Sequence, residues 1–402
     1  MAERAYRFRV YPTPEQEAVV RRTFGCVRWV WNSLLVEQRR RAARGERRLS
    51  YGQTSAYLTA LKRQHDHSWL SDVSCVPLQQ TLRHLARAHV DWGAGKTGAP
   101  VFKRKRDSRQ SAEFTRSAFK WDEPRHLLSL AKIGQLRVRW SRRLPPGCDP
   151  STVTLTRDAA GRTFVSLLVD EVIAPLPPVD RTTALDLGLS AWLTTAEGEK
   201  VANPCYFARH QRQLARAQRS LNRKHKGSNN RRKARARVAR MHARIADARK
   251  DSLHKLTTRL VSENQAIALE RLHVTGLLRN HHLAKAITDA SWGELVRQIT
   301  YKARWYGRQV VQASPWFPSS KRCSACGQVR VNLPIAVRRW TCICGAEHDR
   351  DVNAAINLLA LLAGMQSGSA VGHTVAACGG SVRPAVAEPL CGAAQRSRKT
   401  AE

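Results

Sequence analysis

Three carboxylates lie beside apolar segments, and their order along the chain constrains the fold. Asp186 lies in the apolar run TALDLGL, and Glu270 directly follows the run AIAL. Both runs are typical of buried strands whose carboxyl ends open onto a site. Asp351 instead begins a helical pattern, with Asp349 as a candidate N-cap. The apolar residues at helical spacing are Val352, Ala355, Ile356 and Leu359. The sequence therefore predicts two strands and a helix start that each carry one acid.

The chemistry of grouped carboxylates suggests why three such acids would occur together. Carboxylates held close to one another raise one another's pKa unless a cation neutralises them. Two Mg²⁺ ions fit this role, because Mg²⁺ binds oxygen ligands. Such ions activate a water molecule and stabilise the leaving oxygen of a phosphodiester. We therefore predict a magnesium-dependent catalytic site at Asp186, Glu270 and Asp351, and we expect Asp349 to be an ordinary surface acid.

Four cysteines precede the third acid in a metal-binding pattern. Cys323 and Cys326 form a C-x-x-C pair, and Cys342 and Cys344 follow after a segment of hairpin length. Four thiolates enclose Zn²⁺ without an open position, so the pattern predicts a zinc ribbon with one structural ion. The second pair is C-x-C, whereas most ribbons have C-x-x-C. Either Cys344 or the nearby His348 is therefore the candidate fourth ligand.

Motifs spread over residues 1–362 carry a family resemblance. They are YRFRVYPTPEQ, FGCVRWVWNSLL, GAPVFKRKR, DLGL, ALERLHVTGL, WFPSSKRCSACG and CGAEHDRDVNAAINLL. With these motifs the chain resembles the TnpB family of transposon-encoded RNA-guided endonucleases, which are related to the compact type V CRISPR effectors. The resemblance implies that Asp186, Glu270 and Asp351 are the acids of a RuvC-type, RNase H-like nuclease domain. It also implies that the four cysteines are zinc-ribbon ligands.

The domain organisation follows from pattern and resemblance together. Pattern alone predicts helices in the first ninety residues, then strands, then an α/β region after the proline-rich IAPLPPVD. The resemblance implies an α/β multidomain protein in which a helical recognition lobe is inserted into a small, wedge-like β-barrel. The expected units are a β-barrel at 1–12 and 98–178, a helical lobe at 13–97, a nuclease domain at 179–364 with its zinc ribbon at about 318–348, and a disordered tail at 365–402.

The charge of the chain predicts a polyanionic partner. With 69 Lys and Arg against 31 Asp and Glu, the formal net charge is +38. Residues 209–250 carry sixteen Lys or Arg and a single acid, Asp247. Apolar residues continue through this segment at helical spacing, so we expect a helical hairpin docked on the nuclease core, with a basic face that lines a nucleic-acid channel. The candidate contacts are Arg223, Lys224, Lys226, Arg231, Arg232 and Lys233.

The resemblance implies a function and two alternatives to it. The implied protein is a monomer that carries a guide RNA derived from the transposon end and cuts double-stranded DNA beside a short flanking motif. The first alternative is an RNase H-like transposase, because strand transfer uses the same two-metal geometry with a different nucleophile. The second is a catalytically silent RNA-guided repressor, and the complete acid triad argues against it.

The remaining features predict the compartment. No apolar segment approaches the roughly twenty residues that a membrane span requires, and the N-terminus lacks a signal-peptide pattern. Of ten cysteines, the six outside the zinc pattern are scattered, which fits a reducing compartment. We therefore expect a soluble, cytoplasmic protein that associates with the nucleoid through DNA.

Overall fold

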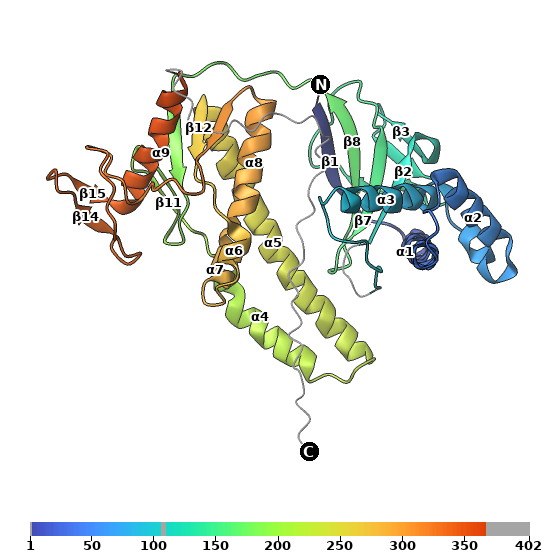
Figure 1. The fold of residues 1–402 in the computed structure, drawn as a ribbon. Coiled ribbons are helices and arrows are strands. Elements are labelled where there is room, and N and C mark those ends of the chain that lie inside the picture. The colour runs from blue at the N-terminus through green and yellow to red at the C-terminus, as the bar shows by residue number, and fades with distance from the viewer. Residues whose placement is uncertain (1, 106–109, 367–402) are drawn as a thin grey trace.

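Two five-stranded sheets, each accompanied by helices, form the framework of the chain (Figure 1). The computed structural model describes residues 2–105 and 110–366, so most of the tail expected to be disordered lies outside the described residues. The last helix extends to Gln366 and so includes the first two residues of that expected tail. None of the described helices combines the length and the apolarity needed to cross a membrane.

The first sheet is formed by strands from the N-terminal half and has the order β2-β7-β8-β1-β6. Its strands are β1 (Ala2–Val10), β2 (Gln110–Thr115), β6 (Val138–Arg139), β7 (Thr152–Arg157) and β8 (Thr163–Glu171). A separate three-stranded sheet contains β3 (Phe119–Asp122), β4 (Leu127–Leu130) and β5 (Gly134–Leu136). Because β2 and β6 end the pairing order, strand pairing does not itself close the first sheet, and the β-barrel stays a prediction.

Three α-helices and the first sheet share one hydrophobic core. The helices are α1 (Pro14–Ala43), α2 (Tyr51–Arg63) and α3 (Cys75–Gly93), with short 3-10 helices at His65–Ser71 and Arg116–Ala118. A capping box formed by Thr13 and Gln16 starts α1, as its sequence predicts. Phe8 of the sheet, Leu34 of α1 and Leu82 of α3 belong to the same buried cluster. The helical region therefore packs on the sheet and does not form a core of its own.

The second sheet has the order β11-β10-β9-β12-β13. Its strands are β9 (Thr182–Asp186), β10 (Ala191–Thr195), β11 (Lys200–Ala202), β12 (Ala266–Leu269) and β13 (Gln309–Gln312). The first three form an antiparallel meander, whereas β12 runs parallel to both β9 and β13. Parallel neighbours need crossover connections, and helices supply them here. The carboxyl ends of β9, β12 and β13 consequently lie along the same sheet edge.

Helices cover both faces of the second sheet. The connecting helices are α4 (Tyr206–Asn222), α5 (Asn229–Glu263), α6 (Val274–Leu277), α7 (Ala284–Ala290) and α8 (Trp292–Trp305). Leu185 and Leu269 pack in one cluster with apolar residues of α5 and α8. Ala184 and Ala268 point to the opposite face, where they contact α9 (Arg350–Gln366). Leucines of β9 and β12 therefore face α5 and α8, and the alanines that alternate with them leave room for α9 on the other face.

The predicted helix after Asp351 is present as α9, but its predicted apolar face is only partly correct, since Ala355 is buried and Leu359 packs on the core. Ile356 is exposed, whereas the buried apolar residues are Ala354, Ala355, Leu358 and Leu362. Two polar residues of α9, Asn353 and Asn357, are buried as well. Their side chains hydrogen bond to the segment before the helix. Part of the buried face of α9 is therefore polar, and apolar residues alone do not mark that face in the sequence.

The predicted helical hairpin is also confirmed. Helices α4 and α5 pack against each other and extend away from the second sheet (Figure 1). Its buried residues are Leu214, Ala217, Ile245, Leu253, Leu256, Thr257, Leu260 and Val261. The last five lie in the second half of α5 and anchor the hairpin to the second sheet. The first half of α5 carries exposed arginines and lysines.

Candidate functional site

The pleat of the second sheet brings the first two acids together. Leu185 of β9 is directly opposite Leu269 of β12, so the next residues, Asp186 and Glu270, stand at the same level. Because side chains alternate across a strand, both acids point to the face that α9 covers. The carboxylate of Glu270 accepts a hydrogen bond of 2.9 Å from the N–H of Leu187, which ties the two strand ends together.

The third acid lies at the start of α9. Asp349, at the end of β15 (Glu347–Asp349), caps this helix by accepting hydrogen bonds from the N–H groups of Asp351 and Val352 at 3.1 and 3.2 Å. Lys200 donates to the other carboxylate oxygen of Asp349 at 2.7 Å. Asp349 is therefore an ion-paired capping residue, and its cap fixes the position of the adjacent Asp351.

Electrostatics show that the three carboxylates interact. Burial, followed by the charges of Glu270 and Asp351, raises the pKa of Asp186 well above its usual range. Burial also raises the pKa of Glu270 to about 7, with a further contribution from Asp351 and opposition from the N–H of Leu187. Nη1 of Arg338 lies 3.3 Å from the carboxylate of Asp351. In the part of the chain that the structure describes, no ion pair reaches Asp186 or Glu270.

The donor set of this acid cluster fits hard cations. Carboxylate oxygens are the ligands that Mg²⁺ prefers. Burial is the main cause of the raised pKa of Asp186 and Glu270, and a bound cation would offset it by stabilising their ionised forms. The three acids do not form a closed metal site in this structure, because their carboxylate oxygens do not all lie within 4.8 Å of one another. Among the described residues, only the four cysteines form a group that close. Arg338, which also donates to the hydroxyl of Ser190 at 3.3 Å, holds Asp351 in this more open arrangement.

The four cysteines of the zinc pattern converge, each offering its sulfur within 4.8 Å of the others. The Sγ atoms of Cys323 and Cys344 are 3.8 Å apart, and those of Cys326 and Cys342 are 3.6 Å apart. Four sulfurs at about 2.3 Å from a tetrahedral Zn²⁺ would be separated by about 3.8 Å, so the spacing fits zinc. Gly327, with a φ of 79°, supplies the left-handed turn after the first pair.

The fourth zinc ligand, which the sequence left open, is better matched by Cys344 than by His348. Cys344 belongs to the converging set, whereas His348 contributes no atom to it. Nε2 of His348 instead lies 3.0 Å from the sulfur of Cys323. Burial opposes ionisation of Cys323, but backbone N–H groups and His348 favour the thiolate and lower its pKa to about 5. His348 therefore acts on a ligand from outside the set.

Two buried asparagines connect the zinc ribbon to the helix of the third acid. The amide oxygen of Asn353 accepts from the N–H of Ser324 at 2.9 Å, and its amide nitrogen donates to the carbonyl of Arg322 at 2.7 Å. Asn357 donates to the same carbonyl at 2.6 Å and to that of Ser319 at 2.8 Å. Both side chains thus hydrogen bond to the backbone beside Cys323. The fold of the zinc ribbon therefore bears directly on the placement of α9.

The basic residues predicted to contact nucleic acid cluster around the tip of the α4–α5 hairpin. Arg223, Lys224, Lys226, Arg232 and Lys233 are exposed there. Arg231 differs, because its guanidinium donates to the carbonyls of Leu221 and Lys224 at 3.1 and 2.7 Å. Arg231 thus stabilises the turn of the hairpin, and the other five present free surface charge.

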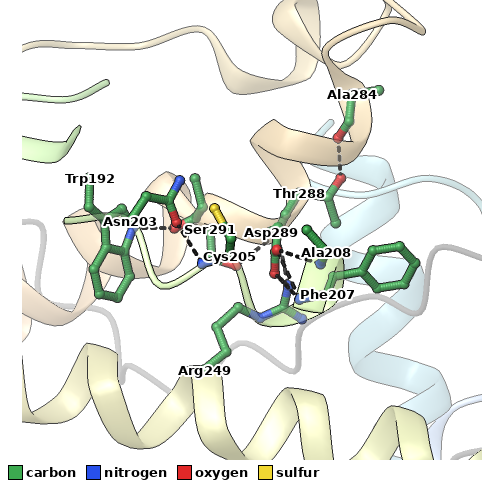
Figure 2. A network of polar contacts seen from close by, with 11 residues as sticks. Trp192, Asn203, Cys205, Phe207, Ala208, Arg249, Ala284, Thr288, Asp289 and Ser291 are labelled. Atoms are coloured by element: carbon green, nitrogen blue, oxygen red, sulfur yellow. Dashed lines mark hydrogen bonds and ion pairs between the residues drawn. The ribbon is translucent and has the colours of Figure 1, made fainter. Parts of the chain in front are cut away.

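A polar network at the base of the hairpin fixes it to the second sheet (Figure 2). The buried Asp289 of α7 accepts from the N–H groups of Phe207 and Ala208, which caps α4 from another element. Arg249 of α5 lies 3.7 Å from the same carboxylate. Trp192 of β10 donates its indole N–H to the carbonyl of Ala290 at 2.7 Å. The hairpin is therefore held by α7, which in turn contacts β10, the strand after Asp186.

Comparisons with known proteins place this geometry in a family. Three family models match: one described as "Probable transposase" over residues 165–281, one described as "Cas12f1-like, TNB domain" over 292–358, and a "Helix-turn-helix domain" over 1–47. A protein of Streptomyces pristinaespiralis named "Putative RNA-guided DNA endonuclease" is 51% identical over 95% of this chain and 92% of its own length. The chain belongs to the TnpB family.

Other similarities of this TnpB-family chain are more distant. "Putative RNA-guided DNA endonuclease InsQ" of Escherichia coli K12 is 31% identical over 96% of this chain and 97% of its own length. A solved structure titled "Cryo-EM structure of the Cas12f1-sgRNA-target DNA complex" matches with a TM-score of 0.47 and 12% identity, over 89% of this chain and 98% of that one. The family assignment does not depend on this structural likeness.

The TnpB-family site contains residues that the sequence did not single out. Arg338 contacts the third acid, Asn353 and Asn357 hold the zinc ribbon on α9, and Asp289 anchors the basic hairpin. The asparagines had a signal, since two polar residues four apart interrupt the apolar pattern of a predicted buried helix. Arg338 and Asp289 had none, because their partners are distant in the sequence.

Zinc content tests the ligand set. We expect the purified protein to contain one Zn²⁺ per chain, and Cys323→Ser and Cys344→Ser to lose it together with thermal stability, because structural zinc contributes to folding. His348→Ala should retain the ion, since His348 lies outside the converging set. Metal analysis of the three variants measures this. Retention of zinc by Cys344→Ser with loss from His348→Ala would reverse the assignment.

The raised pKa of Glu270 predicts that the acid cluster lowers the free energy of unfolding at high pH. Between its usual value of 4.5 and about 7, the folded state binds the proton more strongly than the unfolded state. The free energy of unfolding should therefore fall as pH rises through this window. Glu270→Gln removes that cost and should stabilise the protein at pH 8 by about 1–3 kcal/mol, with much less effect at pH 4.5.

Thermal unfolding at the two pH values, with and without Mg²⁺, measures this difference. Added Mg²⁺ should stabilise the wild-type protein at pH 8 more than the variant, because the ion neutralises the repelling carboxylates. Asp251→Asn, which removes an exposed acid paired with Lys255, is the matched control and should show no such gain. Equal effects of Glu270→Gln at both pH values would contradict a raised pKa.

Proposed function

We propose that this chain is an RNA-guided DNA endonuclease that hydrolyses phosphodiester bonds of double-stranded DNA at Asp186, Glu270 and Asp351. The observation that carries the proposal is the placement of Asp186 and Glu270 at neighbouring strand ends of a TnpB-family chain, with the pKa of both raised and with the charge of Asp351 contributing to each shift. Relatives that align along nearly the whole chain are named as RNA-guided DNA endonucleases.

The three acids would hold two Mg²⁺ ions, which supply activation of the attacking water and stabilisation of the leaving oxygen. The chain's own residues position this site. The hydrogen bond from the N–H of Leu187 orients Glu270, and the Asp349 cap orients the start of α9. Arg338 would leave Asp351 when cations enter and is then available to a phosphate, because a guanidinium binds phosphate oxygens well.

The proposed partners are a guide RNA from the transposon end and a double-stranded DNA target. The net charge of +38 and the exposed cations at the tip of the α4–α5 hairpin support a polyanionic partner. Phosphate contacts of this kind carry no sequence information. Target choice would therefore come from pairing with the guide, and the protein would read a short flanking motif.

The proposed division of labour follows the domain organisation expected from the family. The second sheet with α5, α8 and α9 would be the RuvC-type nuclease domain, with the zinc ribbon inserted before α9. The first sheet would be the wedge-like domain, and α1 to α3 would be the recognition lobe. The ribonucleoprotein would contain one copy of the chain and act on DNA in the cytoplasm, at the nucleoid.

A transposase that performs strand transfer is the second candidate function. It is favoured by one observation, the description "Probable transposase" of the family model that matches residues 165–281. The same acids would serve both reactions, since only the nucleophile differs. The products distinguish them, because hydrolysis leaves free ends and strand transfer joins the ends of two DNA molecules.

Isosteric variants test the proposed site. Asp186→Asn, Glu270→Gln and Asp351→Asn should each lower cleavage of a guide-matched plasmid in Mg²⁺ by at least about 100-fold, because an ion ligand is lost. Binding of RNA should be retained, since the basic hairpin is unchanged. Cleavage is followed on gels and RNA binding by filter retention.

The matched control is Asp349→Asn, which keeps a side chain that caps helices well and removes only the charge paired with Lys200. It should cut within a few-fold of the wild-type rate. An active Asp351→Asn variant beside an inactive Asp349→Asn variant would move the third ligand to Asp349. Joined DNA ends in the wild-type reaction would replace the endonuclease with the transposase.

A further inference from the structure

Trp316 is exposed to a degree that no other tryptophan of the chain approaches. Its side chain is 90% exposed, and the next most exposed tryptophan, Trp92, is 42% exposed. All eleven tryptophans lie within the described residues, so this comparison covers the whole set. An exposed indole of this size contributes little to packing and offers a flat apolar face to a ligand.

The backbone holds Trp316 in a defined turn. Its N–H lies 3.4 Å from the hydroxyl of Ser314, and the N–H of Phe317 donates to the carbonyl of Ser314 at 3.0 Å. Phe317 packs against the core beneath α9, and Pro315 precedes the exposed ring. Phe317 is therefore anchored in the core, and the backbone of Trp316 is held by the turn while its ring faces solvent.

The position of this turn relates it to the nuclease site. It follows β13, which runs parallel to β12, and the N–H of Ala313 donates to the carbonyl of Leu269, the residue before Glu270. Trp316 is three residues beyond that hydrogen bond, so it belongs to the sheet edge that carries Asp186 and Glu270. An exposed ring near this edge could contact a strand of nucleic acid that reaches the acids.

The segment after Trp316 has a composition suited to unpaired nucleic acid. Residues 318–350 carry six Lys or Arg against two acids. The most exposed aliphatic side chains of the described residues also belong to this segment: Val331, Ile343 and Ile335, each more than three-quarters exposed. Cations beside exposed apolar side chains suit a single strand, whose phosphates and base faces are both accessible.

We propose that Trp316 is a stacking platform that holds an unpaired base of the DNA strand being cut, and so positions the neighbouring phosphate at the acids. The inference rests on the proposed endonuclease function and adds a residue to it. Stacking is insensitive to base identity, because every base has an aromatic face. The platform therefore positions any target that the guide has selected.

The first experiment uses the complete ribonucleoprotein and a matched target. Trp316→Ala should slow single-turnover cleavage by about tenfold, as expected from loss of one stacked base, while target binding is unchanged. Trp316→Phe should restore most of the rate. Val172→Ala, which removes an exposed apolar side chain from the segment between the two sheets, is the control and should cut at the wild-type rate.

Abasic substrates then distinguish stacking from a structural effect. A single abasic site is moved through the cut strand, and one position should slow the wild-type enzyme about as much as Trp316→Ala does. At that position the variant should show no further loss, because the contact is already absent. Equal abasic sensitivity of both proteins, or an unchanged rate in Trp316→Ala, would overturn the proposal. Loss of guide-RNA binding would identify an RNA contact instead.

A readout independent of cleavage separates this inference from the proposed function. Single-stranded DNA that contains 2-aminopurine loses fluorescence when the base stacks on an aromatic ring. The wild-type protein and Trp316→Phe should quench this probe, and Trp316→Ala should not. Quenching without any cleavage by the wild-type ribonucleoprotein would retain the platform and reject the endonuclease. Cleavage by the wild-type ribonucleoprotein with equal quenching by all three proteins would retain the endonuclease and reject the platform.

Discussion

The burial of neighbouring carboxylates is the constraint on which the rest of the site depends. The pleat of β9 and β12 places Asp186 and Glu270 side by side, and the start of α9 adds Asp351 on the same face. Water would keep such acids ionised, but here the sheet and helix bury them, and burial raises the pKa of Glu270 to about 7, with a smaller contribution from the charge of Asp351. Secondary structure thus supports an unfavourable arrangement that cations can make favourable.

The parts around the acids share the task of fixing α9. Alanines on β9 and β12 let the helix approach the sheet, Asp349 caps its first turn, and Asn353 and Asn357 attach it to the zinc knuckle. A zinc ion at the four cysteines would therefore influence the position of Asp351 without touching it. The basic hairpin is attached independently, through Asp289 and Arg249 at its base. The exposed basic residues and the acid cluster consequently occupy different elements of the chain.

The sequence was a good guide wherever a signal was local. The capping box at Thr13, the α4–α5 hairpin and the converging cysteines were predicted because spacing along the chain determines each of them. The buried face of α9 was predicted only in part: Ala355 is buried, but Ile356 is exposed, and an apolar pattern does not assign Asn353 and Asn357 to the interior. The contacts of Arg338 and Arg231 were not foreseen, because a charged residue has no sequence signal for its partner.

Guidance by RNA is the central claim, and exchange of the guide tests it most directly. The ribonucleoprotein is assembled with two RNAs that differ only in the guide segment, and each is offered two plasmids that carry one matching target apiece beside the same flanking sequence. The account predicts that cleavage follows the guide from one plasmid to the other and requires both RNA and Mg²⁺. Cleavage that stays on one plasmid after the exchange, or that proceeds equally well without RNA, would contradict it.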